Sequence, residues 1–296
     1  MKGPEFDFYN KTSLKSYNLD QSMRYELQML DRLDVFTRKH SENVASITCR
    51  LCELLHCSKD FTVYCTTCAY LHDVGKQFIP PEVLQKPGKL TDEEYEIMKT
   101  HTTIGYNICM KDLKLRPYAN GAYCHHEALN GTGYPRGLTK KEIPYEAQII
   151  RVADEFDAIS SKRQYKTHIG ISDTLKILIE NAQNGKNNSK VLKCLIKVVI
   201  SDTEYEISCK QDYLDSLSGD VKRLEEIEKY HTKMDAEKKE KKKNFYLEGI
   251  NYLLAQGETL ENHRNIYREY KDAFDTRQAE IDNLWKEIKI IKKLKV

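Results

Sequence analysis

The chain has 296 residues, which is enough for one large domain or two modest ones. Apolar residues make up 40% of it, charged residues 31%, and the formal net charge is only +2. This balance argues against a strongly basic surface that binds a nucleic-acid polymer or an acidic membrane. The apolar runs, such as Val198–Ile200, are too short to span a bilayer, and the N-terminus lacks the apolar core of a secretion signal.

The apolar pattern predicts a mainly helical protein. Residues 1–20 are polar and are expected to form a tail, whereas residues 21–200 carry apolar positions at the three- and four-residue spacing of amphipathic helices. The expected helices lie, in chain order, within residues 22–33, 40–55, 61–72 and 91–106, before about 129, and within 149–159, 171–181 and 191–199. Thr91 and Glu94 form a capping box at the start of the fourth of these. Only Val198–Ser208 offers a conceivable short strand pair, so we expect an all-α bundle.

The sequence changes character in residues 201–296. A charge run at 237–243 is typical of a solvated helix face. From Leu253 a heptad register begins. Its a positions are Leu253, Leu260, Tyr267, Phe274, Ile281 and Ile288, its apolar d positions are Tyr270, Leu284 and Ile291, and Gln256, His263 and Arg277 occupy the other d positions. We expect a coiled-coil-like extension, paired either with a helix around 221–245 in an antiparallel hairpin or with a second chain, as a homodimer or with another protein partner.

The nine cysteines include two C-x-x-C pairs, Cys49 with Cys52 and Cys65 with Cys68, which are spaced like the ligands of a zinc ribbon. Both pairs lie inside predicted helices and lack the glycine-rich turn that directs thiolates toward one ion. We therefore interpret these cysteines as buried apolar residues. Free thiols and the missing signal peptide predict a cytoplasmic protein.

Five of the nine histidines form one ordered series with two aspartates. The series is His40, His72, Asp73, His101, His125, His126 and Asp154. Neutral imidazoles suit iron, manganese, nickel or zinc, and a carboxylate can bridge two cations. Two metals roughly 3.5–4 Å apart are a recurring device for cleaving phosphate esters. The series therefore predicts a buried two-metal site. The other histidines, His56, His168, His231 and His263, match no motif and are interpreted as structural.

The motifs around this series resemble the HD phosphohydrolase superfamily and its HD-GYP subfamily. Residues 72–76 (HDVGK) are similar to the HD motif, and residues 125–135 (HHEALNGTGYP) are similar to the HD-GYP hallmark. Residues 152–158 (VADEFDA) and 163–166 (RQYK) follow in the family's order. The resemblance covers roughly residues 25–200 and implies an HD-type multi-helix bundle.

The resemblance also implies the two metal shells. His40 and Asp154 join His72 around one ion, His101 joins the His125-His126 pair at the other, and Asp73 is shared. Which ion His125 and His126 each face stays open. We expect two divalent ions, iron or manganese first, with nickel, zinc or magnesium as alternatives. Phe36 stands where some members carry a glutamate that binds a third metal, so two are expected here.

The implied activity is hydrolysis of a cyclic dinucleotide, cyclic di-GMP first, to pGpG or GMP by a metal-activated hydroxide. Asp73 and Lys76 are the expected catalytic residues, and Lys76 also resembles the family's phosphate contact. The other expected substrate contacts are Asn130, Gly133, Tyr134, Arg163 and Lys166. Gln148 and Gln164 depart from the arginine and proline of many members. The alternatives are a hydrolase of another nucleotide, including cyclic GMP-AMP, and a receptor that binds cyclic dinucleotide without cutting it.

Overall fold

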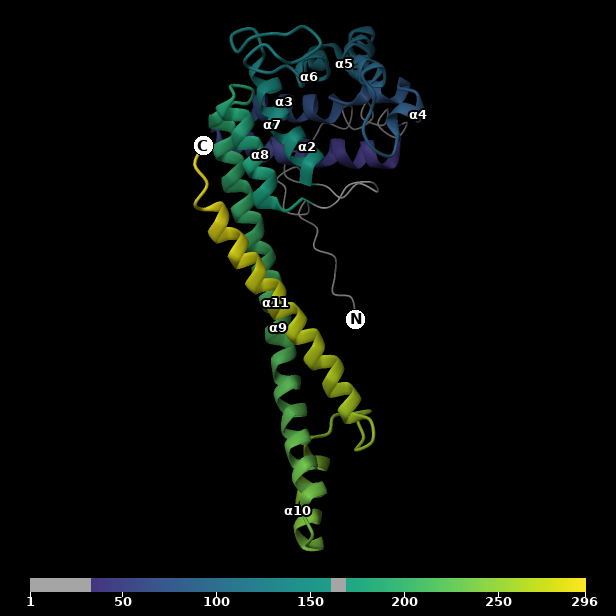
Figure 1. Cartoon of the computed structure of the whole chain (residues 1–296), viewed down its shortest axis with the longest axis vertical. Coiled ribbons are helices and arrows are strands. Elements are labelled where there is room, and N and C mark those ends of the chain that lie inside the picture. Colours follow the sequence, from purple (N-terminus) through teal and green to yellow (C-terminus); the bar gives the residue numbers. More distant parts are fainter. Residues whose placement is uncertain (1–32, 161–168) are drawn as a thin grey trace. The chain divides into compact units, whose positions relative to one another are not determined.

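The computed structural model describes residues 33–160 and 169–296, and every regular element within them is helical (Figure 1). In chain order the elements are α2 (Val35–Leu54), α3 (Lys59–Leu71), η4 (Val74–Phe78), α4 (Pro81–Leu84), α5 (Asp92–Lys111), η5 (Arg116–Tyr118), α6 (Ala119–Cys124), α7 (Tyr145–Ser160), α8 (Ile171–Gln183), α9 (Ser189–Ala236), α10 (Glu240–Leu253) and α11 (His263–Ile291). In the described ranges, only an isolated bridge between Asn130 and Thr139 has β character. The all-α prediction is confirmed.

Two compact units make up the described chain. One comprises residues 33–201, as far as they are described, together with Ile290–Val296, and the other comprises Asp202–Lys289. The domain boundaries expected at residues 20 and 200 stay predictions. None of the helices in the two described ranges is long and apolar enough to cross a membrane.

The core of the first unit lies between α2, α3, α7, α8 and the first turns of α9. Its fully buried members include Val44, Leu51, Cys52, Cys65, Cys68, Ile149, Ile150, Val152, Leu175, Leu178, Val191, Leu192 and Leu195. Both C-x-x-C pairs are buried, and all nine cysteines are free thiols. This placement confirms that the four cysteines of the two pairs serve as small apolar core residues.

The segment Val198–Ser208 is helical, so a strand pair there is wrong. It lies within α9, where Leu192, Leu195 and Val199 are buried at helical spacing on the same face. The short run of β-branched residues at 198–200 is therefore a stretch of an amphipathic helix. Burial of that helical face outweighs the weak local preference for a strand.

The helix boundaries near the histidines mostly follow the sequence. The capping box is present, because the Thr91 side chain accepts from the Glu94 N–H and the Glu94 side chain accepts from the Thr91 N–H. One boundary differs: α6 ends at Cys124, whereas the pattern placed the end near Leu129. The N–H of Leu129 donates to the Lys186 carbonyl at 3.0 Å, a long-range bond that replaces the helical one.

Gly75 brings η4 into direct backbone contact with α5. A Cβ atom at this position would lie 2.0 Å from the carbonyl oxygen of His101 and 2.6 Å from the nitrogen of Gly105. Only a residue without a side chain permits that approach. The packing places Asp73, at the start of η4, beside His101.

The second unit is an antiparallel pairing of α9 with α11, with α10 and a loop between them. Ile207 and Leu214 of α9 form one buried cluster with Ile281 and Ile288 of α11. A second cluster groups Leu224, Ile227 and Ile250 with, among others, Leu253, Leu260, Tyr267 and Tyr270. The heptad positions therefore pack within this chain, as the hairpin alternative proposed. The expected helix bounds were wrong. The partner helix expected around 221–245 is interrupted, because α9 ends at Ala236, and the heptad register that begins at Leu253 crosses the loop before α11.

We expect Gly75→Ala to destabilise the protein by about 3 kcal/mol, because the added methyl group meets backbone that cannot move aside alone. Urea unfolding followed by circular dichroism measures the change. Gly219→Ala is the control, since its Cβ meets nothing within 4 Å in the interior of α9. The control should stabilise its helix by up to about 1 kcal/mol. Equal stability of the two variants would contradict the close approach of η4 to α5.

Candidate metal centre

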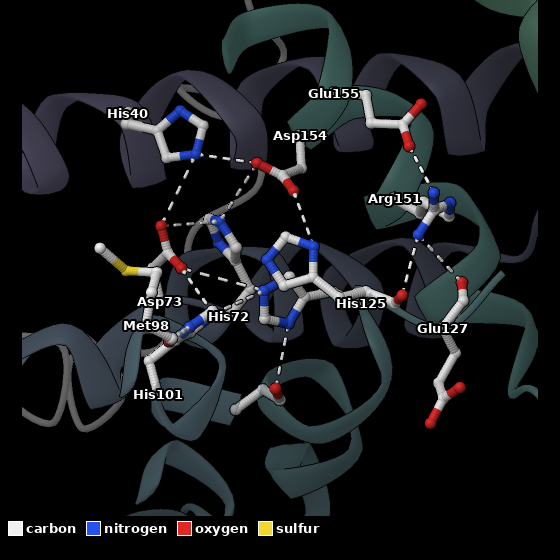
Figure 2. Close-up of polar contacts among 12 residues, drawn as sticks. His40, His72, Asp73, Met98, His101, His125, Glu127, Arg151, Asp154 and Glu155 are labelled. Carbon is white, nitrogen blue, oxygen red and sulfur yellow. Dashed lines mark hydrogen bonds and ion pairs between the residues drawn. The ribbon is translucent and has the colours of Figure 1, made fainter. Parts of the chain in front are cut away.

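The structure brings all seven predicted ligands together (Figure 2). His40 comes from α2, His101 from α5 and Asp154 from α7, while the two pairs lie at helix ends. His72-Asp73 joins α3 to η4, and His125-His126 directly follows α6. All seven are buried except His126, whose side chain is 24% exposed.

Four of the ligands surround one space. The Nε2 atom of His40 lies 2.9 Å from Oδ1 of Asp154 and 3.6 Å from Oδ2 of Asp73. The Nε2 atom of His72 lies 3.3 Å from the same Oδ2 and 3.9 Å from Oδ1 of Asp154. These two imidazoles and two carboxylates match the first expected shell.

The second group faces the other oxygen of Asp73. Oδ1 of Asp73 lies 3.4 Å from Nε2 of His101 and 3.8 Å from Nε2 of His125. Those two nitrogens are 3.3 Å apart, and Nδ1 of His126 is 3.8 Å from Oδ2 of Asp154. His101, His125 and His126 can each offer a ligand atom within 4.8 Å of the others. The Asp73 carboxylate thus directs one oxygen to each group.

The donor set and its spacing fit divalent metal ions. Metal–ligand bonds of about 2.0–2.2 Å imply separations of about 3–3.5 Å between neighbouring ligand atoms, close to the distances found here. The Nε2 atom of His72 and Oδ1 of Asp73 are buried without any hydrogen-bond partner. Buried polar atoms are rarely left unpaired, and one cation held by each group would satisfy both atoms.

Three imidazoles are oriented by their own chain segment. The Nδ1 atoms of His72, His101 and His125 each bond to the carbonyl oxygen three residues earlier, at 2.7, 2.7 and 3.0 Å. A carbonyl can only accept, so Nδ1 carries the proton and Nε2 presents its lone pair. Each ring therefore points its ligand atom at Asp73 or at another ring of the centre.

His40 is oriented by a carboxylate that the sequence interpretation missed. Its Nδ1 bonds to Oδ2 of Asp157 at 2.7 Å, and Asn43 donates to the other oxygen of Asp157 at 3.0 Å. Burial lowers the pKa of His40, but hydrogen bonds to Asp154 and Asp157 outweigh it and raise the pKa to about 9. The two carboxylates thus favour a positive charge on this ring or a cation at its Nε2. Because Asp157 follows Asp154 by three residues, the helical spacing could have revealed its role.

Burial and charge keep the other ligands in their metal-binding states. Burial lowers the pKa of His101 to about 4 and holds the pKa values of His125 and His126 well below their usual range, so these rings are neutral at pH 7. Burial alone would raise the pKa of Asp73, but a neighbouring imidazole and the Lys76 ammonium hold it well below its usual range. His101, His125 and His126 therefore offer neutral nitrogens beside an ionised Asp73, as metal binding requires.

Among the expected substrate residues, Lys76 and Tyr134 lie at the centre. The Lys76 ammonium contacts Oδ2 of Asp73 at 2.5 Å, and the Tyr134 ring stacks on His126 with centroids 4.7 Å apart. Gly133 permits this approach, because a Cβ there would lie 2.2 Å from the nitrogen of Ala128. The side chain of Asn130 is occupied by other contacts. It accepts a hydrogen bond from Thr132 in its own loop and donates one to the Asn184 carbonyl at the end of α8.

Three further expectations concern residues around the centre. Gln148 donates to the Ile143 carbonyl at 3.0 Å and accepts from Asn188 at 2.9 Å, so its amide shapes local backbone. Phe36 lies in the first turn of α2 with an exposed side chain and offers no ligand atom. Arg163, Gln164 and Lys166 lie outside the described residues.

Two residues that the sequence interpretation left without a role hold the loop after α6. The Glu127 carboxylate accepts the N–H groups of Arg136 at 2.7 Å and Leu138 at 2.8 Å. The Arg151 guanidinium donates to the His126 carbonyl at 2.9 Å and pairs with Glu155 (Figure 2). These contacts fix the backbone that presents His126 and Tyr134.

Sequence comparison agrees with this geometry. The chain belongs to the HD domain family, whose model matches residues 24–191 and thus includes every candidate ligand. The match confirms the resemblance that the motifs indicated.

Several curated proteins are similar to the same region. The chain is 40% identical over 167 residues to a cyclic di-GMP phosphodiesterase of Thermotoga maritima, covering 56% of this chain and 45% of that protein. It is 36% identical over 154 residues to 3'3'-cGAMP-specific phosphodiesterase 3 of Vibrio cholerae, covering 52% of this chain and 34% of that protein. It is 42% identical over 127 residues to the response regulator RpfG of Xanthomonas campestris, a cyclic di-GMP phosphodiesterase. That match covers 42% of this chain and 34% of RpfG. The chain thus spans less than half the length of these relatives.

We expect Asp157→Asn to weaken metal binding about 10–100-fold, because the amide no longer holds the His40 ring as a carboxylate does. Competition with a chromophoric chelator measures the change. Asp173→Asn, an exposed position on α8, is the matched control and should bind metal like the unaltered protein. Unchanged affinity in Asp157→Asn would contradict an orienting role of Asp157 at the His40 ring.

Proposed function

We propose that this chain is a metal-dependent phosphodiesterase that hydrolyses a cyclic dinucleotide, with cyclic di-GMP as the first candidate. One observation carries the proposal: the two oxygens of the Asp73 carboxylate face two separate groups of imidazole nitrogens. That arrangement suits a pair of bridged cations, and paired cations are a recurring solution for cleaving phosphate esters. The similarity to phosphodiesterases of cyclic dinucleotides supports the same substrate class.

In this proposal the seven ligands hold two divalent ions, His40, His72 and Asp154 at one and His101, His125 and His126 at the other, with Asp73 between them. When bound, such ions supply Lewis acidity for the phosphoryl oxygens and lower the pKa of water at the centre. Iron or manganese fits the nitrogen-rich set first, while nickel, zinc and magnesium remain alternatives. The protein's own contribution is to aim the Nε2 atoms of His72 and His101 inward through backbone hydrogen bonds at Nδ1.

Lys76 and Tyr134 are the proposed contacts to the substrate phosphates. The Lys76 ammonium lies at the edge of the centre, where a bound phosphate would replace part of its interaction with Asp73. Burial raises the pKa of the Tyr134 phenol, so its hydroxyl stays a neutral donor at physiological pH. Asn130 and Gly133 would act by shaping the loop that carries Tyr134. Direct contacts from Arg163 and Lys166 stay predictions.

A second candidate substrate is cyclic GMP-AMP, because one similar protein is a 3'3'-cGAMP-specific phosphodiesterase. The two dinucleotides share the phosphodiester ring and differ in one base, so the metal centre treats them alike. Selectivity would come from residues that contact the bases.

The nine free thiols agree with the reducing cytoplasm as the proposed location.

We expect the purified chain, loaded anaerobically with Fe²⁺ or Mn²⁺, to convert cyclic di-GMP to pGpG or GMP. Asp73→Asn should abolish turnover, because the amide cannot bridge two cations as the carboxylate does. Chromatography of the nucleotides, run beside cyclic GMP-AMP and linear nucleotides, measures rate and selectivity. His56→Asn is the control, since it removes a histidine outside the centre at a backbone position with φ of 57°, which asparagine tolerates.

The outcomes separate the alternatives. Turnover of a different nucleotide alone would keep the metal centre and replace the substrate. Tight binding of intact cyclic di-GMP, without product under either metal, would identify a receptor and overturn the enzymatic proposal.

We expect Tyr134→Phe to lower kcat/KM about 10–100-fold while metal content is unchanged, because the ring still stacks on His126 and only the hydroxyl is lost. Steady-state kinetics and elemental analysis on the same samples measure both. Tyr95→Phe is the matched control, because that ring is nearby but half exposed. Full activity of Tyr134→Phe would remove the hydroxyl from substrate recognition.

A further inference from the structure

A second group of potential ligands lies in the second unit. Glu228 and His231 are three residues apart on α9 and therefore share a face, and His263 is the first residue of α11. Each offers a ligand atom within 4.8 Å of the others. The sequence interpretation gave both histidines only a structural role, because thirty-odd residues separate them and no motif joins them.

His263 is fully buried and presents a free lone pair to this group. Its Nδ1 bonds to the Leu260 carbonyl at 2.8 Å, which places the proton on Nδ1. Its Nε2 lies 3.3 Å from Oε2 of Glu228 and has no hydrogen-bond partner. A neutral ring would therefore direct a lone pair at a carboxylate, an arrangement that either a metal cation between the two atoms or a proton on Nε2 relieves.

His231 adds a second unsatisfied nitrogen. Its Nδ1 is buried without a partner, and its ring meets that of His263 edge to face, with centroids 4.8 Å apart. On its other side, Nε2 lies 3.9 Å from Oδ1 of Asp235, which is beyond hydrogen-bond distance. The unpartnered Nε2 of His263 and one ring nitrogen of His231 thus belong to the same group as the Glu228 carboxylate.

The spacing suits a small transition-metal ion. Zinc bonds of about 2.0–2.1 Å in a tetrahedron place neighbouring ligand atoms about 3.4 Å apart, close to the 3.3 Å between His263 and Glu228. Two imidazoles and one carboxylate leave the fourth position to water, as in zinc sites with three protein ligands. The donor set disfavours magnesium and calcium, which prefer oxygen.

The loop that carries His263 is fixed to α9 independently of any ion. The Arg223 guanidinium makes two bonds to the Glu258 carboxylate, at 2.5 and 2.8 Å, and donates to the Leu253 carbonyl at 3.0 Å. Thr259 and Asn262 then bond reciprocally just before α11. The ligands are therefore held in place before binding, which lowers the entropic cost of capturing an ion.

Arg264 is the main competitor for Glu228. Its Nε lies 3.2 Å from one carboxylate oxygen and 3.0 Å from the other. The two oxygens share this one N–H donor, so Arg264 can keep its bond to Oε1 while Oε2 binds an ion. Ligating carboxylates are commonly held by such an outer hydrogen bond.

We propose that Glu228, His231 and His263 form a separate binding site for a zinc-like divalent cation, which ties the start of α11 to α9. This site is independent of the proposed phosphodiesterase centre. Its ion would stabilise the second unit, because it binds the folded arrangement of residues that lie far apart in an unfolded chain.

The test compares the full chain with His231→Gln and His263→Gln. Each protein is stripped with chelator, loaded with Zn²⁺ and desalted, and zinc per chain is then measured by elemental analysis. We expect each variant to hold one zinc fewer than the unaltered chain. His56→Asn, a histidine outside both sites, should keep the full amount. Asp73→Asn should lose zinc from the other centre while the difference made by His231→Gln persists, so the two sites can fail separately.

Thermal unfolding gives a second readout. In EDTA, His231→Gln and the unaltered chain should melt alike, because the imidazole contributes mainly through the ion. Added Zn²⁺ should raise the melting temperature of Asp73→Asn but not that of Asp73→Asn combined with His231→Gln. Equal zinc content in the unaltered chain and both variants would overturn the proposal. If a variant fails to fold, crystals of the unaltered chain soaked in Zn²⁺ decide the matter: no anomalous peak among the three side chains overturns it.

Discussion

The first unit depends on one buried carboxylate. Asp73 is fully buried and ionised, so its charge must be matched by positive charge nearby. Lys76 and the His40 ring supply positive charge, and imidazole nitrogens at helix ends and on α5 stand where cations would add more. The close packing at Gly75 fixes where that carboxylate lies. The remaining helices then place their donors around it, and the proposed chemistry follows from that placement.

Helix ends and backbone carbonyls fix the orientation of the imidazole rings in the centre. His72 and His125 cap the C-terminal ends of α3 and α6, where carbonyls without helical partners are available. Each ring uses such a carbonyl to fix its tautomer, so the protein needs few extra side chains for orientation. His40 instead uses Asp157 and Asn43. His40 is thus oriented by side chains of two helices, whereas three of the other rings use backbone of their own segment.

The sequence predicted what depends on local pattern and missed what depends on distant contacts. The capping box at Thr91, the all-α fold and the apolar role of the cysteines were predictable, because residue type and spacing determine them. The end of α6 was misplaced because a bond from Leu129 to the remote Lys186 ends the local pattern. The heptad register ignored the break after Leu253, and the pairing of His231 with His263 required the fold of the second unit.

The cysteines have a practical consequence. Seven of the nine thiols are buried, and Cys49, Cys52, Cys65 and Cys68 are fully buried on α2 and α3. An alkylating reagent reaches such sulfurs only when the surrounding helices separate, so its rate reports how often they do. The protein thus carries native reporter groups for breathing motions of the bundle. Slower alkylation after an ion or nucleotide is added would indicate how much that ligand reduces the frequency at which the helices separate.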